Sequence, residues 1–243
     1  MIRLLFLAML LLFHRVVLCG RFNLKNPKDI EARFGHMDWY ERRVEPRFNI
    51  APTQEILTIV LTPEGRREVQ VASWGLVPFW MRKSGSQKPS PQINARAETV
   101  SSSPMFRTAL KEHRCLIPAS GFYEWIREGK ARTPMHIQLK DGGLFAFAGL
   151  WLPGKHDGLP TATIVTGKPN ELVAQIHNRM PVILRAEDEA AWLDPSEQNP
   201  TRLLKTFPTE EMRAYAVQPL VNSFQNDGPE LIEPAIVEQL RLP

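Results

Sequence analysis

Proline residues are spread along this chain and limit the length of any regular element. There are 21 prolines among the 243 residues, well above the usual share of about 5%. Because proline lacks a backbone N–H and fixes φ, it interrupts helices and is confined to strand ends and sheet edges. The chain therefore favours many short strands joined by loops, and it disfavours long helices.

Short runs rich in apolar and β-branched residues lie between the turn signals. They predict strands at 55–61, 68–74, 114–117, 122–127, 135–139, 144–151, 162–166, 181–184 and 212–217. Helix-start signals predict short helices over about 26–34, 103–112, 168–177 and 186–193. We find no internal repeat, and we predict a single α+β domain with a curved, mostly antiparallel, barrel-like sheet.

The first eighteen residues resemble a signal peptide, with Arg3 ahead of an apolar run from Leu4 to Phe13. The run is too short to span a membrane, which needs about 20 residues, and the small residues of a cleavage site are missing before Cys19. Three interpretations stay open: a misplaced translation start with Leu18 read as methionine, genuine secretion or lipidation, and another propeptide. We favour the first, and expect a domain over 19–235 and a tail over 236–243.

The composition excludes some classes of protein and leaves the charge open to two interpretations. The two cysteines, Cys19 and Cys115, have no zinc-type spacing and make no disulfide scaffold, which suits a reducing compartment. Residues 21–114 carry sixteen Lys/Arg against ten Asp/Glu, whereas 115–243 carry twelve against sixteen. The basic first half is compatible with a polyanion-binding face, and also with an ordinary mixed surface.

Six segments stand out as motifs. They are Cys19-Gly-Arg-Phe, Arg47-Phe-Asn-Ile-Ala-Pro, Trp74-Gly-Leu-Val-Pro-Phe-Trp, Ile93-Asn-Ala-Arg-Ala-Glu-Thr, Gly121-Phe-Tyr-Glu-Trp and Ile176-His-Asn-Arg-Met-Pro. In this order and spacing, the chain resembles the SOS-response-associated peptidase (SRAP) family, whose members process abasic sites in DNA. The resemblance runs from Cys19 to about Leu231. The extension before Cys19 departs from it, because the family begins with Met directly before this cysteine.

Cys19 as a free N-terminal residue would offer an amine and a thiol two carbons apart. An aldehyde condenses with the amine to an imine, and the thiol then closes a five-membered thiazolidine ring. Ordinary pKa values of about 8 and 8.5 leave both groups partly reactive near neutrality. An abasic deoxyribose is such an aldehyde once its ring opens. The alternative is that Cys19 is merely a small buried hydrophobic residue.

Three further residues are candidates for the chemistry. Glu124, between Tyr123 and Trp125, points to the opposite face of its strand; it is either a solvated residue or a general acid–base group. His177, at a helix end, is either structural or available to assist imine formation or strand cleavage. The resemblance makes Glu124, His177 and Asn94 active-site residues, with Asn94 orienting the others.

Arginines accompany three of the reactive positions. Arg21, Arg96 and Arg179 stand near Cys19, Asn94 and His177, and their planar guanidinium groups suit phosphate; the alternative for each is a surface ion pair. Trp74, Phe79 and Trp80 are expected on a turn, with core packing favoured for Trp74 and base stacking for Trp80. DNA contacts are assigned to Arg21, Asn49, Trp80, Arg96, Thr166 and Arg179, in a basic groove.

The function we expect is covalent capture of abasic sites in single-stranded DNA through Cys19, which shields the lesion during a DNA damage response. Strand-cleaving lyase activity and self-release of the crosslink are compatible with it. We expect no cofactor, no metal, no membrane association, a monomer, and a cytoplasmic, nucleoid-associated location. The rivals are a cysteine peptidase that processes its own N-terminal segment, a non-enzymatic nucleic-acid-binding module and an exported lipoprotein.

Overall fold

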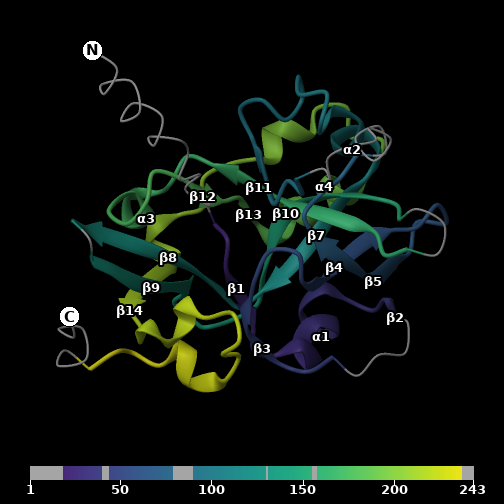
Figure 1. Ribbon diagram of the computed structural model, residues 1–243. Coiled ribbons are helices and arrows are strands. Elements are labelled where there is room, and N and C mark those ends of the chain that lie inside the picture. Colours follow the sequence, from purple (N-terminus) through teal and green to yellow (C-terminus); the bar gives the residue numbers. More distant parts are fainter. Residues whose placement is uncertain (1–18, 40–43, 79–89, 130, 155–157, 237–243) are drawn as a thin grey trace, which may run out of the picture.

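The structure is a computed structural model that describes residues 19–39, 44–78, 90–129, 131–154 and 158–236. Strands dominate, and they form two sheets with a few short helices around them (Figure 1). The predicted α+β class is confirmed.

The larger sheet contains a closed ring of five strands. Neighbours in the order β11–β10–β7–β4–β5 pair antiparallel, and the parallel pairs Thr161–Ser73 and Ala162–Trp74 join β5 back to β11. The strands are β4 (Glu55–Leu61), β5 (Arg67–Trp74), β7 (Arg114–Ala119), β10 (Phe145–Leu152) and β11 (Thr161–Gly167). The barrel-like core is therefore present, and closure leaves these strands without a free edge on the ring.

Four very short strands pair with strands of the barrel. Strand β6 (Asn94–Arg96) runs parallel to β11, and β12 (Met180–Pro181) runs antiparallel to it. Strand β13 (Ile183–Leu184) pairs with β10, and β2 (Asp38–Trp39) pairs with β5. Thr166 of β11 has Arg96 as partner in one pairing and Pro181 in the other, so the motifs over 93–99 and 176–181 meet at this end of β11.

The second sheet has the strand order β14–β9–β8–β1–β3, and every pairing in it is antiparallel. Its strands are β1 (Phe22–Leu24), β3 (Arg47–Ile50), β8 (Gly121–Glu128), β9 (Ala131–Leu139) and β14 (Met212–Ala216). Ser120 alone separates β7 of the barrel from β8, so the chain passes directly from one sheet into the other.

The helices are short, as the proline pattern predicts. They are α1 (Ile30–Phe34), α2 (Arg107–Glu112), α3 (Glu171–Ala174) and α4 (Ala186–Leu193), with 3₁₀ turns η1 (Pro27–Asp29), η3 (Pro200–Leu203), η4 (Thr209–Glu211), η5 (Pro219–Asn222) and η6 (Pro229–Ile232). Within the part of the chain described, no helix is long and apolar enough to cross a membrane.

Three expectations about local structure need correction. Trp74 does not lie on a turn: it is the last residue of β5, is fully buried, and packs edge-on against Phe22. The predicted strand 181–184 is two strands with different partners, because Val182 between them bonds to both Val165 and Ala148. Helix α3 is shorter than predicted, because Asn170 caps it by accepting the Val173 N–H.

Candidate active site

The nitrogen of Cys19 lies against the carboxyl group of Glu124. Its N–H donates to Glu124 Oε1 over 2.8 Å. The pairing of β1 with β8 produces this contact, since Phe22 stands opposite Phe122 and the Tyr123 N–H donates to the Arg21 carbonyl. Cys19, which lies shortly before β1 in the chain, is thereby brought to Glu124. Cys19 also has φ 46°, a left-handed conformation that few non-glycine residues adopt.

Cys19 and Glu124 are both buried. Glu124 is only 3% exposed, so it is not the solvated strand residue that its position also allowed. Burial raises the pKa of Glu124, and its contact with Cys19 and the charge of His177 oppose that rise. Burial also raises the pKa of the Cys19 thiol, Glu124 adds to the effect, and the charge of Arg179 opposes it. The thiol is therefore held in its neutral form, and the carboxyl group keeps its proton to higher pH than usual.

His177 lies just after α3 and is half-buried. Its Nδ1 accepts the Arg179 backbone N–H over 3.1 Å, so the neutral ring carries its proton on Nε2. An open groove runs beside His177. It is lined on one side by Trp125 and Arg127 of β8, and on the other by the segment 175–178. His177 thus combines a fixed tautomer with access from solvent.

Two residues, Glu98 and Thr166, hold the Arg179 side chain. Its guanidinium donates to both carboxylate oxygens of Glu98, over 2.5 and 2.9 Å, and to the Thr166 carbonyl over 2.6 Å. Thr166 is buried, whereas Arg96 next to it is exposed. Asn94 is half-buried at the start of β6, opposite Ile164. The structure therefore brings Thr166, Arg96 and Arg179 together at one end of β11.

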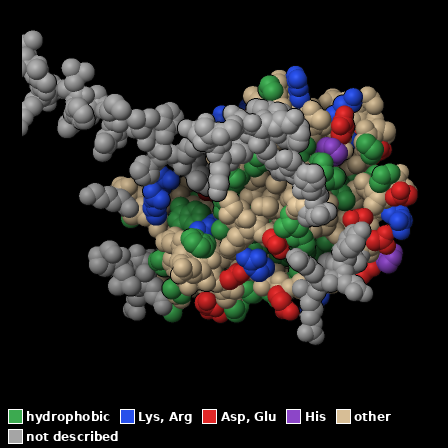
Figure 2. Space-filling model, turned by 45° about the vertical axis from the view of Figure 1, so that its right-hand side comes forward, with side chains coloured by type: hydrophobic (Ala, Val, Ile, Leu, Met, Phe, Trp, Pro, Cys, Tyr) green, Lys and Arg blue, Asp and Glu red, His purple; other side chains and the backbone are tan. Residues whose placement is uncertain are grey.

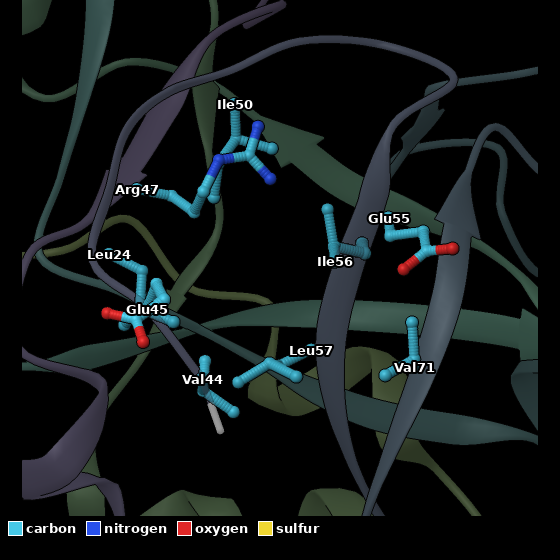
Figure 3. Close-up of a pocket in the computed structure, with 9 residues that line it drawn as sticks. All are labelled: Leu24, Val44, Glu45, Arg47, Ile50, Glu55, Ile56, Leu57 and Val71. Carbon is cyan, nitrogen blue, oxygen red and sulfur yellow. The ribbon is translucent and has the colours of Figure 1, made fainter. Parts of the chain in front are cut away.

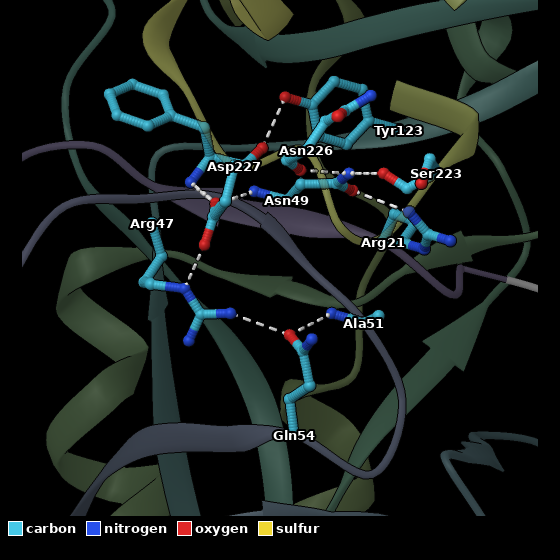
Figure 4. Close-up of polar contacts among 10 residues, drawn as sticks. Arg21, Arg47, Asn49, Ala51, Gln54, Tyr123, Ser223, Asn226 and Asp227 are labelled. Atoms are coloured by element: carbon cyan, nitrogen blue, oxygen red, sulfur yellow. Dashed lines mark hydrogen bonds and ion pairs between the residues drawn. The ribbon is translucent and has the colours of Figure 1, made fainter. Parts of the chain in front are cut away.

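Arg21 and Asn49 lie together in a different setting (Figure 4). Asn49 is fully buried; its Oδ1 accepts from Arg21, and its Nδ2 donates to the carbonyls of Val221, Ser223 and Asn226. Arg21 also donates to the Val221 carbonyl. Both predicted DNA contacts thus fasten the C-terminal segment 221–226 to β1 and β3, and their contact with DNA stays a prediction.

Two expectations about the surface remain. Phe79 and Trp80, and with Trp80 the predicted base-stacking contact, lie outside the described residues. On the face drawn in Figure 2, acidic and basic side chains lie interspersed where side chains are described, which matches the mixed-surface interpretation on that face.

The sequence did not reveal several residues that support the site. Asp227 accepts the backbone N–H groups of Phe48 and Asn49 over 2.5 and 2.7 Å and pairs with Arg47 (Figure 4). His136 is buried among side chains of the neighbouring strands. No sequence signal pointed to Asp227, whereas Glu98 was visible inside the Asn94–Thr99 motif.

A second hollow lies apart from the Cys19–Glu124 contact (Figure 3). Its walls are mostly apolar and come from β1, β3, β4 and β5, with Glu45, Arg47 and Glu55 among the lining side chains. It shares no residue with the Cys19–Glu124 contact or with the end of β11.

Comparison with known families adds an observation that is independent of this geometry. The family described as SOS response associated peptidase (SRAP) matches residues 18–224. The chain therefore belongs to the SRAP family.

Individual relatives carry a common designation. The chain is 44% identical to abasic site processing protein YoqW of Bacillus subtilis, over 89% of this chain and 99% of that protein. It is 29% identical to abasic site processing protein HMCES of Gallus gallus, over 85% and 72% of the two chains. A crystal structure of a Bacteroides thetaiotaomicron protein superposes with a TM-score of 0.77 at 29% identity, covering 90% of this chain and all of that one.

Proposed function

We propose that this protein binds abasic sites in single-stranded DNA and captures the sugar covalently through Cys19. The observation that carries the proposal is the 2.8 Å contact between the Cys19 nitrogen and Glu124 Oε1. In a chain that begins at Cys19, this nitrogen is the α-amine, so an amine, a thiol and a buried carboxyl group share one place. The designation of the relatives as abasic site processing proteins supports this substrate.

The atoms and electrons of the capture reaction balance without a cofactor. Ring opening moves a proton from the C1 hydroxyl group to the ring oxygen and yields the aldehyde. The amine adds to C1, and loss of one water gives an imine. The thiol sulfur then adds to the imine carbon while its proton passes to nitrogen, which closes the thiazolidine. Because amine and thiol belong to one residue, the last step is intramolecular.

Glu124 is suited to the ring-opening step. Its raised pKa leaves the carboxyl group protonated at a higher pH than an ordinary glutamate, so it can donate to the ring oxygen. His177, with Nε2 as its proton carrier, serves the loss of water at the imine stage, and Asn94 orients the sugar. An imine also acidifies the neighbouring carbon, so lyase activity and self-release by the reverse steps belong to the same proposal.

The cysteine peptidase alternative requires a different state of Cys19. A nucleophilic cysteine acts as its thiolate, and burial raises the pKa of this thiol well above its ordinary value. A neutral thiol can still add to an imine, because its proton is needed at the nitrogen. Peptide hydrolysis would need a base that ionises this thiol, whereas the group beside Cys19 is a carboxyl group whose own pKa is raised.

The test is an adduct that survives denaturation. A chain beginning at Cys19 is mixed with single-stranded DNA that carries one abasic site, and we expect a shifted band on a denaturing gel. Cys19→Ala should give none, whereas Cys115→Ala should crosslink like the parent, because Cys115 is fully buried in β7 of the barrel. A stable adduct with Cys19→Ala, or full activity of a chain that retains residues 1–18, would overturn the proposal.

A further inference from the structure

Glu98 covers the groups of Arg179 that would face a phosphate. Arg179 donates one N–H from Nη1 and one from Nη2 to the two oxygens of Glu98, over 2.5 and 2.9 Å. This parallel, two-bond geometry is the one that a guanidinium also offers to phosphate. The carboxylate thus stands where a DNA phosphate would bind.

The other side of Arg179 is fixed by the barrel. Nη2 also donates to the Thr166 carbonyl over 2.6 Å and to Thr166 Oγ1 over 3.3 Å. The Arg179 side chain is only 14% exposed, whereas that of Glu98 is 43% exposed. If one partner leaves, it is therefore Glu98, which can turn into solvent while Thr166 keeps the guanidinium in place.

The charges around Glu98 also resemble those expected around a phosphate. Arg179, through its hydrogen bonds and then its charge, lowers the pKa of Glu98, and the charge of Arg96 adds to the effect. Glu98 is therefore ionised near neutrality, and it lies in the field of two arginines that the sequence assigns to DNA. Glu98 lies in the turn after β6, beyond Ala97, so its side chain can move without disturbing the pairing of β6 with β11.

We propose that Glu98 is a phosphate placeholder: it occupies Arg179 in the DNA-free protein and is displaced by a phosphate of the bound strand. The inference rests on the proposed function and specifies how that site controls its affinity. Glu98 keeps Arg179 aligned and desolvated, and it also competes with every anion for it. Weak anions then fail to displace it, whereas a strand that makes further contacts succeeds.

The experiment separates this role from a general charge effect. The probe is a single-stranded oligonucleotide with a tetrahydrofuran in place of the abasic sugar, which cannot form an aldehyde and so reports non-covalent binding alone. Glu98→Gln is compared with Glu187→Gln, because both remove one negative charge from an exposed carboxylate that is paired with an arginine. Thermal unfolding verifies that both variants are folded.

We expect Glu98→Gln to bind the probe about two- to fivefold more tightly than Glu187→Gln. This is the range expected when a phosphate no longer has to break one partly exposed ion pair before it binds Arg179. In an Arg179→Ala background this difference should vanish, because Glu98 acts through Arg179. Equal or weaker binding by Glu98→Gln, or a difference that persists without Arg179, would overturn the placeholder alone. A parent protein that did not bind the probe would overturn the proposed function as well.

Discussion

At the scale of single residues, burial raises the pKa values of Cys19 and Glu124. An ordinary glutamate is ionised at neutral pH, whereas Glu124 lies in a buried strand, where its charged form is disfavoured. Glu124 accepts a hydrogen bond from the very nitrogen that we propose as nucleophile. Proton donor and nucleophile are thus adjacent before any substrate arrives.

Replacing Glu124 by glutamine should slow crosslinking by about 10²–10⁴-fold, the usual contribution of general acid–base catalysis. Glutamine keeps the shape and can still accept from the Cys19 nitrogen, so non-covalent affinity should hardly change. The parent rate should fall as the pH rises through the raised pKa of Glu124, and the variant should lack this fall. Single-turnover crosslinking across pH 5–9 measures both effects.

Glu189→Gln is the matched control for this experiment. Glu189 of α4 is also a buried carboxyl group with a pKa raised by burial, but it pairs with Arg33 of α1 rather than with Cys19. It should crosslink at the parental rate. A parental rate for Glu124→Gln as well would remove Glu124 from the mechanism.

At the scale of elements, a buried network joins four strands of the second sheet. The Nε2 atom of His136 in β9 accepts a hydrogen bond from Asn23 of β1. Its Nδ1 atom lies 2.9 Å from the hydroxyl group of Tyr215 in β14. Tyr215 in turn donates to the Ile232 carbonyl. A Cβ on Gly121 of β8 would lie 2.4 Å from His136 Nε2, so only glycine fits there. The network fixes the sheet that holds Glu124.

This network makes stability depend on pH in the acidic range. Burial lowers the pKa of His136 to about 3, and the charges of Lys25 and Arg213 act in the same direction. Between about pH 6.5 and 3, the unfolded chain binds a proton that the folded chain does not, so stability falls as the pH falls. The loss approaches about 1.4 kcal/mol per pH unit.

His136→Gln should reduce that dependence, because glutamine does not titrate. Denaturant unfolding of parent and variant at pH 7, 6, 5 and 4 gives the two slopes. The variant is expected to be less stable at pH 7, where it loses ring contacts, and to lose less on acidification. Parallel slopes would mean that His136 is protonated in the folded protein.

The C-terminal segment depends on a second element-scale contact, centred on Asp227. Asp227→Asn removes the charge that pairs with Arg47 and weakens two backbone contacts of β3. We expect a loss of about 1–3 kcal/mol in unfolding free energy, since charged hydrogen bonds are affected. Asp188→Asn, which weakens the 3.4 Å pair between Asp188 and the exposed Lys205, should cost much less. Similar losses for both variants would contradict this account.

The sequence predicted the long strands far better than the short ones. Strand β4 and helix α4 lie at their predicted bounds, because apolar periodicity and helix propensity act within each segment. Strands β1, β3 and β6 were missed, since each has only three or four residues and contains a polar side chain. Their strand state comes from partners far along the chain, which local patterns do not encode.

At the scale of the whole molecule, the fold gathers the motifs at one end of β11 and along β8. The resemblance indicated which residues belong together, and Cys19 and Glu124 do meet. It did not indicate that Glu98 would occupy Arg179, or that Asn49 would fasten the C-terminal segment. Each of those contacts joins residues that are far apart in the sequence, and their relative positions depend on the complete fold.

Salt dependence tests the proposed DNA-binding face as a whole. Each phosphate contact that is lost should reduce the slope of log affinity against log salt by about 0.7 for a single strand. Arg96→Ala and Arg179→Ala should each show this reduction. Arg185→Ala, which lies in a surface pair with Glu187 and Glu211, should not. Equal slopes for all three variants and the parent would contradict a phosphate contact at this end of β11.

The central claim, that Cys19 closes a thiazolidine with the sugar, is tested most directly by counting free thiols in the adduct. The protein has two cysteines, Cys19 and Cys115. Denatured protein beginning at Cys19 should take up two alkylating groups from iodoacetamide, whereas its DNA adduct should take up one, because the Cys19 sulfur is part of the ring. Intact mass should give protein plus DNA minus one water. An adduct of that mass that takes up two groups would contradict the account.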